Sequence, residues 1–256
     1  MPNPHGSFIW YELMTSDPAA AAAFYGNVVG WSASDSGVPG LDYRILSDQT
    51  GQAGGILAIS KTGCENGMKP VWLGYIGVED VDSAVGAIVS EGGRLHMAAE
   101  DIPNVGRMAM VADPQGIPFY VMRGASEEVS TAFDPKAQRR VAWNELVTTD
   151  QAGALDFYGR HFGFERAGAM PMGAMGDYVF IAHDGVPIGA VMNRSPQQER
   201  PMWNFYFRVG SIDSAAERVR AGGGEVVQGP MEVPGGDFVI VGRDPQGASF
   251  GLVGGR

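Results

Sequence analysis

Cysteine is nearly absent from the chain, because its 256 residues include only Cys64. A lone cysteine can form no internal disulfide, which fits a reducing compartment. No histidine stands near Cys64 to favour the thiolate, so we interpret it as a small filler residue. The sequence also lacks an apolar run approaching the roughly 20 residues that span a bilayer, and its first residues show neither a basic start nor an apolar stretch. We therefore expect a cytoplasmic protein with no membrane partner.

Positive charge is also scarce. Eighteen Lys and Arg residues stand against 29 Asp and Glu residues, which gives a formal net charge of −11. Such a field repels the phosphates of nucleic acids and the headgroups of anionic lipids. Nucleic-acid binding is therefore not expected.

The dominant feature that the sequence does contain is an internal repeat. Trp-Tyr-Glu-Leu at 10–13 returns as Trp-Asn-Glu-Leu at 143–146, and Asp-Pro-Gln-Gly occurs at both 113–116 and 244–247. The spacing between matching segments changes by only two residues across each copy, which places the slip in a loop. The polar stretch 125–138 shows no sustained hydrophobic period. We therefore predict two domains, 1–124 and 139–256, joined by a linker at 125–138.

Within each copy, the pattern of strand, helix and three strands occurs twice. A strand is predicted over 8–14, followed by a helix with Asp17 as N-cap and Pro18 in its first turn, ending near Gly30. A second helix is predicted where apolar residues recur at helical spacing and Gly92-Gly93 ends the run. The other strands of the first copy are predicted near 43–47, 55–60, 71–78, 94–98, 107–112 and 118–123. The fold class is therefore α+β, with four βαβββ modules.

Several motifs carry a resemblance to a known family. The spacing Asp-x-x-x-Ala-x-x-Phe-Tyr-x-x-x-x-Gly is present at 17–30 and again at 150–163, and Val-x-Asp-Val-Asp-x-Ala is present at 78–84. With the paired modules and the Asp-Pro-x-Gly turns, the chain resembles the vicinal-oxygen-chelate superfamily of glyoxalases, bleomycin-resistance proteins and extradiol dioxygenases. The resemblance covers nearly the whole chain. It implies two tandem glyoxalase-like domains, each with a cupped mixed sheet and flanking helices.

Taken by themselves, the same residues have structural explanations. Adjacent aromatics such as Phe24-Tyr25 are expected to pack where a helix lies flat on a sheet. Asp-Pro-Gln-Gly is a β-turn sequence, with proline and glycine at positions that suit a type I turn. These motifs predict the fold and leave the reaction open.

The resemblance also implies a test for a metal. In enzymes of that family, His, Gln or Glu from the first strand of each module and a Glu from the last strand hold a divalent cation, which acts as a Lewis acid. Carried over by spacing, these positions fall at Trp10, Leu73 and Tyr120 in the first half, and at Trp143, Asn204 and Gly251 in the second. None of the three in the first half binds a cation well, and in the second half only Asn204 offers an oxygen ligand, a neutral one. We therefore predict no cofactor, and a divalent metal held by atypical ligands is the alternative.

Acidic and aromatic residues remain on the strands of the implied cup. Because side chains alternate along a strand, Glu12 shares a face with Trp10, and Glu145 shares a face with Trp143. A carboxylate in such a cavity is a candidate general base or ligand acceptor, and a hydrogen bond to backbone or to an arginine is an equally good interpretation. The predicted ligand-binding residues are Trp10, Tyr75, Tyr120, Trp143, Asn204, Tyr206 and Arg208.

Two functions are compatible with these residues. The first is a metal-free protein that binds a small planar or aromatic molecule, as the bleomycin-resistance branch of the family does. The second is a glyoxalase-type lyase or a dioxygenase-type enzyme that uses atypical ligands, or Glu12 or Glu145 as a base. The four modules already supply the pairings that shorter relatives gain by dimerising, so a monomer is expected, with a homodimer left open.

Overall fold

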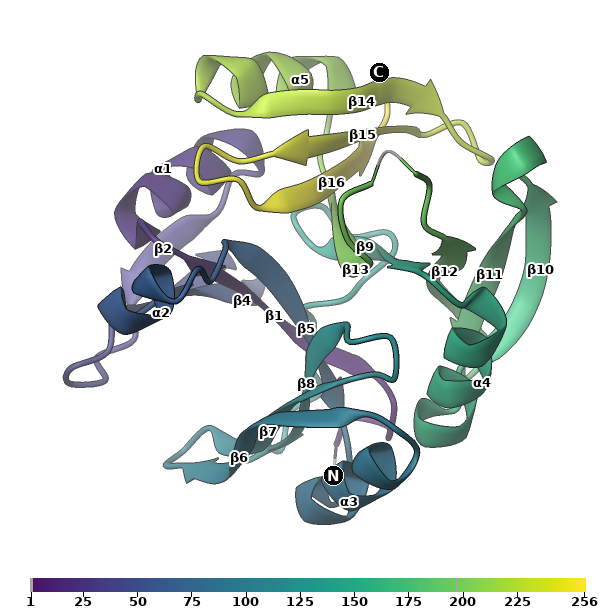
Figure 1. Cartoon of the computed structure of the whole chain (residues 1–256). Helices are drawn as coiled ribbons and strands as arrows, with labels where there is room; N and C mark the ends of the chain where they lie inside the picture. Colours follow the sequence, from purple (N-terminus) through teal and green to yellow (C-terminus); the bar gives the residue numbers. More distant parts are fainter. Residues whose placement is uncertain (1, 197) are drawn as a thin grey trace. The chain divides into compact units, whose positions relative to one another are not determined.

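The computed structural model describes residues 2–196 and 198–256 of the chain (Figure 1). It repeats one order of elements four times, and each module begins with a strand that is followed by a helix and three more strands. The first module contains β1 (Phe8–Thr15), α1 (Pro18–Val28), β2 (Ser32–Asp35), β3 (Tyr43–Asp48) and β4 (Gly51–Ala58), followed by the short α2 (Lys61–Glu65). The second contains β5 (Val71–Gly77), α3 (Val81–Ser90), β6 (Arg94–Ile102), β7 (Gly106–Ala112) and β8 (Pro118–Gly124).

The second copy has the same order. The third module contains β9 (Val141–Thr148), α4 (Gln151–Phe162), β10 (Glu165–Pro171), the 3-10 turn η1 (Gly173–Met175), β11 (Asp177–His183) and β12 (Val186–Asn193). The fourth contains β13 (Met202–Arg208), α5 (Ile212–Ala221), β14 (Glu225–Glu232), β15 (Phe238–Arg243) and β16 (Ser249–Gly254). The α+β class and the four βαβββ modules predicted from the repeat are confirmed. None of the helices in the described part of the chain combines the length and the apolar character that a membrane span requires.

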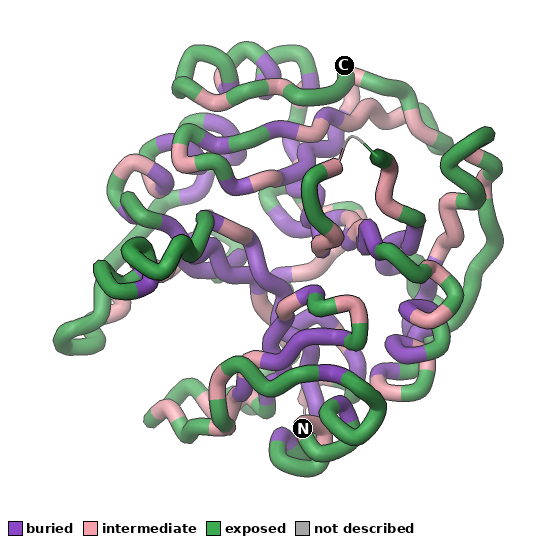
Figure 2. The backbone as a smooth tube through the Cα atoms, in the orientation of Figure 1, coloured by how far each residue is buried: buried purple, intermediate pink, exposed green. Residues whose placement is uncertain are grey.

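The strands form two eight-stranded mixed sheets over the described residues, one from β1–β8 and one from β9–β16. Within the first module the order is β2-β3-β4-β1, and the third module repeats it as β10-β11-β12-β9. The last strand of a module runs parallel to its first strand, as Glu12 opposite Gly55 illustrates, whereas the outer pairs are antiparallel. Figure 2 shows that buried residues concentrate in the inner strands, and the outer strands β2 and β14 are mostly exposed.

Residue contacts divide the chain into two compact units, and each unit takes one module from each copy of the repeat. The first unit comprises Met1–Ile9, Gly74–Ser130 and Trp143–Trp203, and the second comprises Trp10–Leu73, Thr131–Ala142 and Asn204–Arg256. The chain passes from one unit to the other within β1, β5, β9 and β13, the first strand of each module, and again between Ser130 and Thr131. The boundaries inferred from the repeat, with a linker at 125–138, stay a prediction.

In the second unit, α1 and α5 lie against each other (Figure 1). Helix α1 begins where predicted, because Asp17 Oδ1 accepts a hydrogen bond from the Ala20 amide and Pro18 occupies the first turn. Its buried face includes Phe24 and Tyr25. The adjacent aromatics therefore pack in the core, as the sequence indicated.

Tyr25 also carries a polar link through that core. Trp72 Nε1 donates to the Tyr25 hydroxyl at 2.8 Å, and this hydroxyl donates to Asp244 Oδ2 at 3.1 Å. Asp244 Oδ1 accepts from the amides of Gln246 and Ala248, which closes the turn predicted from Asp-Pro-Gln-Gly. The turn residue thus holds its own loop with one oxygen and the helix with the other.

The first unit repeats this link with the corresponding residues. Trp203 Nε1 donates to the Tyr158 hydroxyl at 3.0 Å, and the hydroxyl donates to Asp113 Oδ2 at 3.2 Å. All three side chains are buried. Burial raises the pKa of Asp113 to about 6, although hydrogen bonds from Ile117 and Tyr158 oppose the shift. Burial likewise raises the pKa of Tyr158, and the Asp113 charge adds to the rise.

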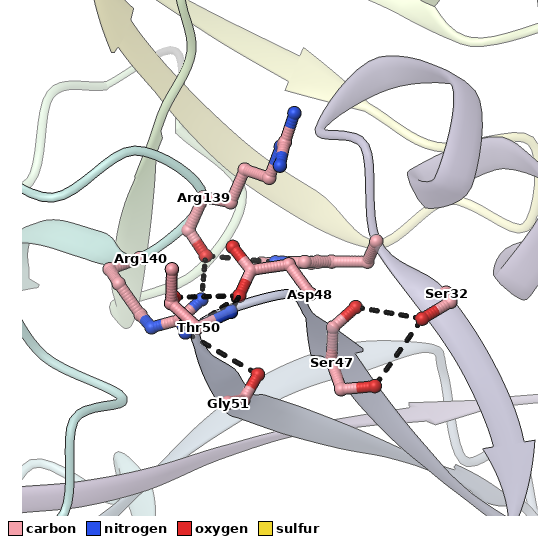
Figure 3. Close-up of polar contacts among 8 residues, drawn as sticks. Ser32, Ser47, Asp48, Thr50, Gly51, Arg139 and Arg140 are labelled. Carbon is pink, nitrogen blue, oxygen red and sulfur yellow. Dashed lines mark hydrogen bonds and ion pairs between the residues drawn. The ribbon is translucent and has the colours of Figure 1, made fainter.

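A buried ion pair anchors the segment that precedes β9 in the second unit (Figure 3). Arg140 Nη2 donates to Asp48 Oδ1 at 2.9 Å and to Thr50 Oγ1 at 2.6 Å, and both charged side chains are almost fully buried. Burial by itself would raise the pKa of Asp48, but hydrogen bonds from Arg140 and Thr50 outweigh it and lower the pKa to about 2. The pair joins two parts of the sequence that have no common motif.

Three details differ from the sequence expectation. Strand β2 is exposed along its whole length, so it has no hydrophobic alternation by which it could be recognised. Helix α2 is short and depends on a cap, in which Ser60 Oγ accepts from the Gly63 amide. In α3, whose apolar residues at helical spacing were expected to face the core, only Val81 and Ile88 are buried, and Val89 is 44% exposed.

Candidate functional site

A polar chain on β9 and β11 of the first unit joins two of the predicted site residues. Trp143 Nε1 donates to the Tyr178 hydroxyl at 2.8 Å, and that hydroxyl donates to Glu145 Oε2 at 2.9 Å. All three side chains are partly exposed, whereas Asn144 between them is buried on the other face of the strand. The alternation of β9 therefore brings an indole and a carboxylate to one phenolic hydroxyl on an accessible surface.

Phe180 extends this cluster into an aromatic wall. Its ring lies edge-on to Trp143, with centroids 6.1 Å apart, and edge-on to Tyr178 at 5.8 Å. Strand β12 runs between β9 and β11, and its Ala190 lies opposite both Phe180 and Glu145. A small side chain at 190 lets larger groups from the flanking strands meet above it. We call Trp143, Glu145, Tyr178 and Phe180 the aromatic–acid cluster.

The first module has a matching arrangement within the second unit. Trp10 Nε1 donates to the Tyr43 hydroxyl at 2.8 Å, and Glu12, two residues beyond Trp10, is 2% exposed. Gly55 stands where Ala190 stands in the third module, and a side chain there would collide with the Tyr43 hydroxyl. The glycine is thus required for the tyrosine to reach the indole. The deep burial of Glu12 contrasts with the partly exposed Glu145.

Tyr75 and Tyr120, two of the predicted ligand-binding residues, contact each other in the first unit. They are opposite neighbours on the parallel strands β5 and β8, and their rings stack with centroids 4.1 Å apart and an interplanar angle of 17°. Both are 3% exposed. Each ring therefore covers the other.

The remaining predicted residues lie on β13 in the second unit. Asn204 is buried and accepts a hydrogen bond from Ser249 Oγ at 3.2 Å. The ring of Tyr206 lies against Gly251 on β16, where a Cβ atom would collide with it. Arg208 donates to the Pro135 carbonyl and pairs with Asp237 at 2.9 Å. Arg208 thus has partners within the protein, which leaves less of its guanidinium for a ligand.

Histidines gather elsewhere in the first unit. His5 Nε2 lies 2.8 Å from the His161 carbonyl oxygen, and His183 Nε2 lies 2.8 Å from that of His5. These ring nitrogens meet backbone oxygens instead of converging on one point. Across the described residues, no group of three or more His, Cys, Asp or Glu side chains has the geometry to hold a metal ion.

Two members of the aromatic–acid cluster were not found from the sequence. Tyr178 and Phe180 lie on the third strand of their module, in a segment without a family motif. The repeat itself held the signal, because Tyr43 and Tyr178 occupy matching places in β3 and β11, and both accept a hydrogen bond from a first-strand tryptophan. The two tyrosines are 135 positions apart, whereas Trp10 and Trp143 are 133 apart, so only a comparison of the copies that allows a two-residue shift would have indicated the pair.

The relationships to known proteins agree with this architecture. The family model for the Glyoxalase/Bleomycin resistance protein/Dioxygenase superfamily matches residues 7–121 and 140–252, that is, both copies of the repeat. The chain belongs to the Glyoxalase/Bleomycin resistance protein/Dioxygenase superfamily. The family resemblance inferred from the motifs is thereby confirmed.

Two curated relatives align along almost the whole chain. CFP32 from Mycobacterium bovis, which bears the name of a candidate glyoxylase, is 32% identical over 246 residues, covering 95% of this chain and 93% of its own. The anthracycline biosynthesis protein DauV from Streptomyces sp. strain C5 is 30% identical over 260 residues, covering 97% and 93%. The two relatives therefore carry different names, one of a glyoxylase and one of an anthracycline biosynthesis protein.

Solved structures of the superfamily show the same fold. The Mn(II)-bound glyoxalase from Novosphingobium aromaticivorans superposes with a TM-score of 0.67 at 15% identity, covering 98% of this chain and 82% of its own. A variant of homoprotocatechuate 2,3-dioxygenase from B. fuscum gives a TM-score of 0.66 at 16% identity, covering 98% and 72%. The likeness extends to the fold, and one neighbour holds a divalent metal.

Proposed function

We propose that this superfamily member binds a small planar or aromatic organic molecule at the aromatic–acid cluster, without the divalent cation that its enzymatic relatives use. The observation that carries the proposal is the chain of hydrogen bonds from Trp143 through Tyr178 to Glu145. It combines partly exposed aromatic faces with a fixed carboxylate acceptor. Ligand pockets are typically built in this way, from apolar walls and a few placed polar groups.

The chemistry of the family's metal positions favours a metal-free site. Trp10, Leu73, Trp143 and Gly251 have no side-chain atom that binds a hard cation well, and Asn204 already accepts a bond from Ser249. At Gly251, the closing position of the second half, the ring of Tyr206 fills the space that a carboxylate side chain would need. The Tyr120 ring is stacked on Tyr75. We infer that these residues do not fit the cation, and no reaction step is routed through it.

The relatives support an aromatic ligand. DauV and its homologue DnrV from Streptomyces peucetius, which are 30% and 29% identical to this chain, are named for anthracycline biosynthesis. Anthracyclines are planar aromatic compounds. A flat ring system could lie against Trp143 and Phe180 while a hydroxyl or amine group donates to Glu145.

Direct binding measurements test the proposal. An anthracycline is titrated into the protein while tryptophan fluorescence is followed, and the titration is repeated with Glu145→Gln and Trp143→Phe. We expect saturable quenching in the wild type and an affinity at least about tenfold weaker in Glu145→Gln, because a hydrogen bond to a charged acceptor contributes about 1.5–3 kcal/mol. Glu165→Gln, at an exposed carboxylate on β10 of the same unit, is the matched control and should bind like the wild type.

Metal content separates the proposal from the alternative function. Protein purified without chelator is analysed for metals, and its melting temperature is measured with Ni, Zn, Mn and Fe(II). Background metal and no cation-specific rise in melting temperature are expected. A stoichiometric cation would instead favour a metal-dependent lyase or dioxygenase with atypical ligands, and would overturn the metal-free part of the proposal.

A further inference from the structure

A polar pocket lies in the second unit, and its lining includes the sequence neighbours of Arg140 and Arg208. It has a volume of about 430 Å³ and lies at the end of α1. Its lining consists of Asn27, Val28, Val29, Gly30, Gln138, Arg139, Val209, Gly210 and Arg218. The lining thus contains two arginines and no acidic residue, although the chain as a whole has a net charge of −11.

Arg139 has an unusual backbone conformation. Its φ is +62°, in the left-handed region that residues other than glycine rarely adopt. Hydrogen bonds hold it there, because its amide donates to the Arg208 carbonyl, and its own carbonyl accepts from Trp31 Nε1 at 2.8 Å and from Arg140 Nη1 at 3.0 Å. Figure 3 shows the Arg139 guanidinium directed away from the buried pair of Asp48 and Arg140.

The repeat shows what normally occupies this position. In the first unit, the Gly6 amide bonds the Gly77 carbonyl just as the Arg139 amide bonds that of Arg208, and Gly6 has a φ of +93°. The conformation suits glycine, so the arginine in the second copy is held in a backbone conformation that glycine would adopt without strain. Its side chain lies over Gly30, where a Cβ would be 2.9 Å from Nε.

Arg218 is the second cation of the pocket, and it also has no counterpart in the other copy. It is the seventh residue of α5, and the seventh residue of α3 is Ala87. One Nη donates to the Val28 carbonyl at 3.3 Å, whereas Nε is buried and has no hydrogen-bond partner within the described residues. A buried guanidinium N–H without an acceptor is costly unless something else supplies one.

The matching region of the first unit is electrically balanced. There the helix end carries Arg160 and His161, and Glu91, the C-cap of α3, lies 2.7 Å from Arg160 and 3.3 Å from His161. In the second unit the C-cap of α5 is Gly222, so that acid is absent. Neither Arg139 nor Arg218 forms an ion pair with a described residue. The first unit neutralises its cations internally, and the second leaves two cations in a pocket.

From this juxtaposition we propose that the Arg139–Arg218 pocket binds a phosphate group, free or carried on a small molecule. Two guanidinium groups supply several N–H donors and a charge that matches a phosphate dianion better than a single carboxylate. The missing acceptor for Arg218 Nε is then an oxygen of the ligand. A volume of about 430 Å³ leaves room for an organic group attached to the phosphate.

Inorganic phosphate is the probe that tests the site. It is titrated at constant ionic strength against chloride, and binding is followed by calorimetry and by the melting temperature. We expect saturable binding in the wild type and an affinity at least about tenfold weaker in both Arg139→Gly and Arg218→Ala, which restore the residues of the other copy. Arg160→Ala, which removes an arginine already paired with Glu91, should leave phosphate affinity unchanged.

Arg139→Gly also separates a binding role from a structural one. Glycine adopts positive φ without strain, so the variant should be at least as stable as the wild type when phosphate is absent. Lower stability in chloride together with unchanged phosphate affinity would overturn the proposal. So would the absence of saturable phosphate binding to the wild type up to about 20 mM, a very weak affinity. Stronger binding of phenyl phosphate than of inorganic phosphate would identify an ester as the source of the group, and weaker binding would identify the free ion.

Discussion

The hydroxyl of Tyr158 donates a hydrogen bond to Asp113 Oδ2 at 3.2 Å, which joins a helix of the second copy of the repeat to a turn of the first. Tyr25 and Asp244 make the reciprocal bond in the other unit. In the sequence, the Phe-Tyr motif is explained by helix packing and the Asp-Pro-Gln-Gly motif by a β-turn, each without reference to the other. The structure shows that the tyrosine of the first motif in one copy forms a hydrogen bond with the aspartate of the second motif in the other copy.

The burial of Asp113 predicts a pH-dependent stability. Its pKa of about 6 in the fold lies above the ordinary value of 3.8, so ionisation weakens the fold, and stability falls as pH rises from about 4 to about 6. Because one pKa unit corresponds to about 1.4 kcal/mol, the loss should be about 3 kcal/mol. Urea unfolding between pH 4 and 7 should show Asp113→Asn gaining on the wild type by that amount. Ser90→Ala, at an exposed helix end without a charge, should change the free energy of unfolding by the same amount at every pH. If the effect of Asp113→Asn is also independent of pH, the assignment is wrong.

Removing a buried hydroxyl should cost much more than removing a partly exposed one. Tyr158→Phe removes the hydrogen bonds that Asp113 Oδ2 and Trp203 Nε1 make with this hydroxyl in the core, and losing a buried hydrogen-bond partner costs about 1–3 kcal/mol. We expect a loss of about 2–4 kcal/mol in the free energy of unfolding. Tyr178→Phe is the matched control, since water can reach its neighbours, and it should cost less than about 1 kcal/mol. Equal losses would contradict the difference in burial.

The ion pair of Asp48 and Arg140 should be essential at neutral pH. Asp48→Asn leaves the buried Arg140 charge uncompensated, which typically costs about 3–5 kcal/mol. The lowered pKa of about 2 means that the stability supplied by Asp48 is present above pH 4 and is lost as pH falls towards 2. The gap between the variant and the wild type should therefore narrow by about 2 kcal/mol in acid. Asp42→Asn, which breaks the exposed pair with Arg44, is the control and should cost less than about 1 kcal/mol. A stability difference between Asp48→Asn and the wild type that stays constant down to pH 2 would contradict the expectation.

Substitution at Gly251, on the last strand of the second copy, tests whether the Tyr206 ring fills the space that a side chain at this position would need. Gly251→Ala should destabilise the protein by about 2 kcal/mol or more through overpacking, and much less in a Tyr206→Ala background. Chemical denaturation of the two single variants and the double variant measures this coupling. Gly86→Ala, where a Cβ meets open space on α3, should be neutral or slightly stabilising. Purely additive effects of the two changes would show that the ring does not fill the site.

The sequence was most informative where chemistry is local or repeated. Asp17 and Pro18 define the start of α1, and the matching letters in the two copies predicted all four modules. The exposed strand β2 was missed because its formation depends on pairing with β3, which leaves no hydrophobic pattern of its own.

The candidate site was predicted only in part, for a related reason. Alternation along β9 placed Trp143 and Glu145 on one face, but Tyr178, which links them, comes from a strand more than 30 residues later. Register between distant strands fixes such contacts, and register is not encoded in any short segment. The pairing of Arg140 with Asp48 is hidden in the same way, since the two residues are 92 positions apart.

The division of the chain into units has a consequence for how the protein should respond to being cut. Each unit contains one module from either side of the segment 125–138. A protease cut in that segment would therefore produce two polypeptides, each of which supplies one module to each unit. Tyr158 and Asp113 would then belong to different fragments, as would Tyr25 and Asp244. The nicked protein should migrate as one species under native conditions and as two only after denaturation, behaving as an enforced heterodimer of its own duplicated halves.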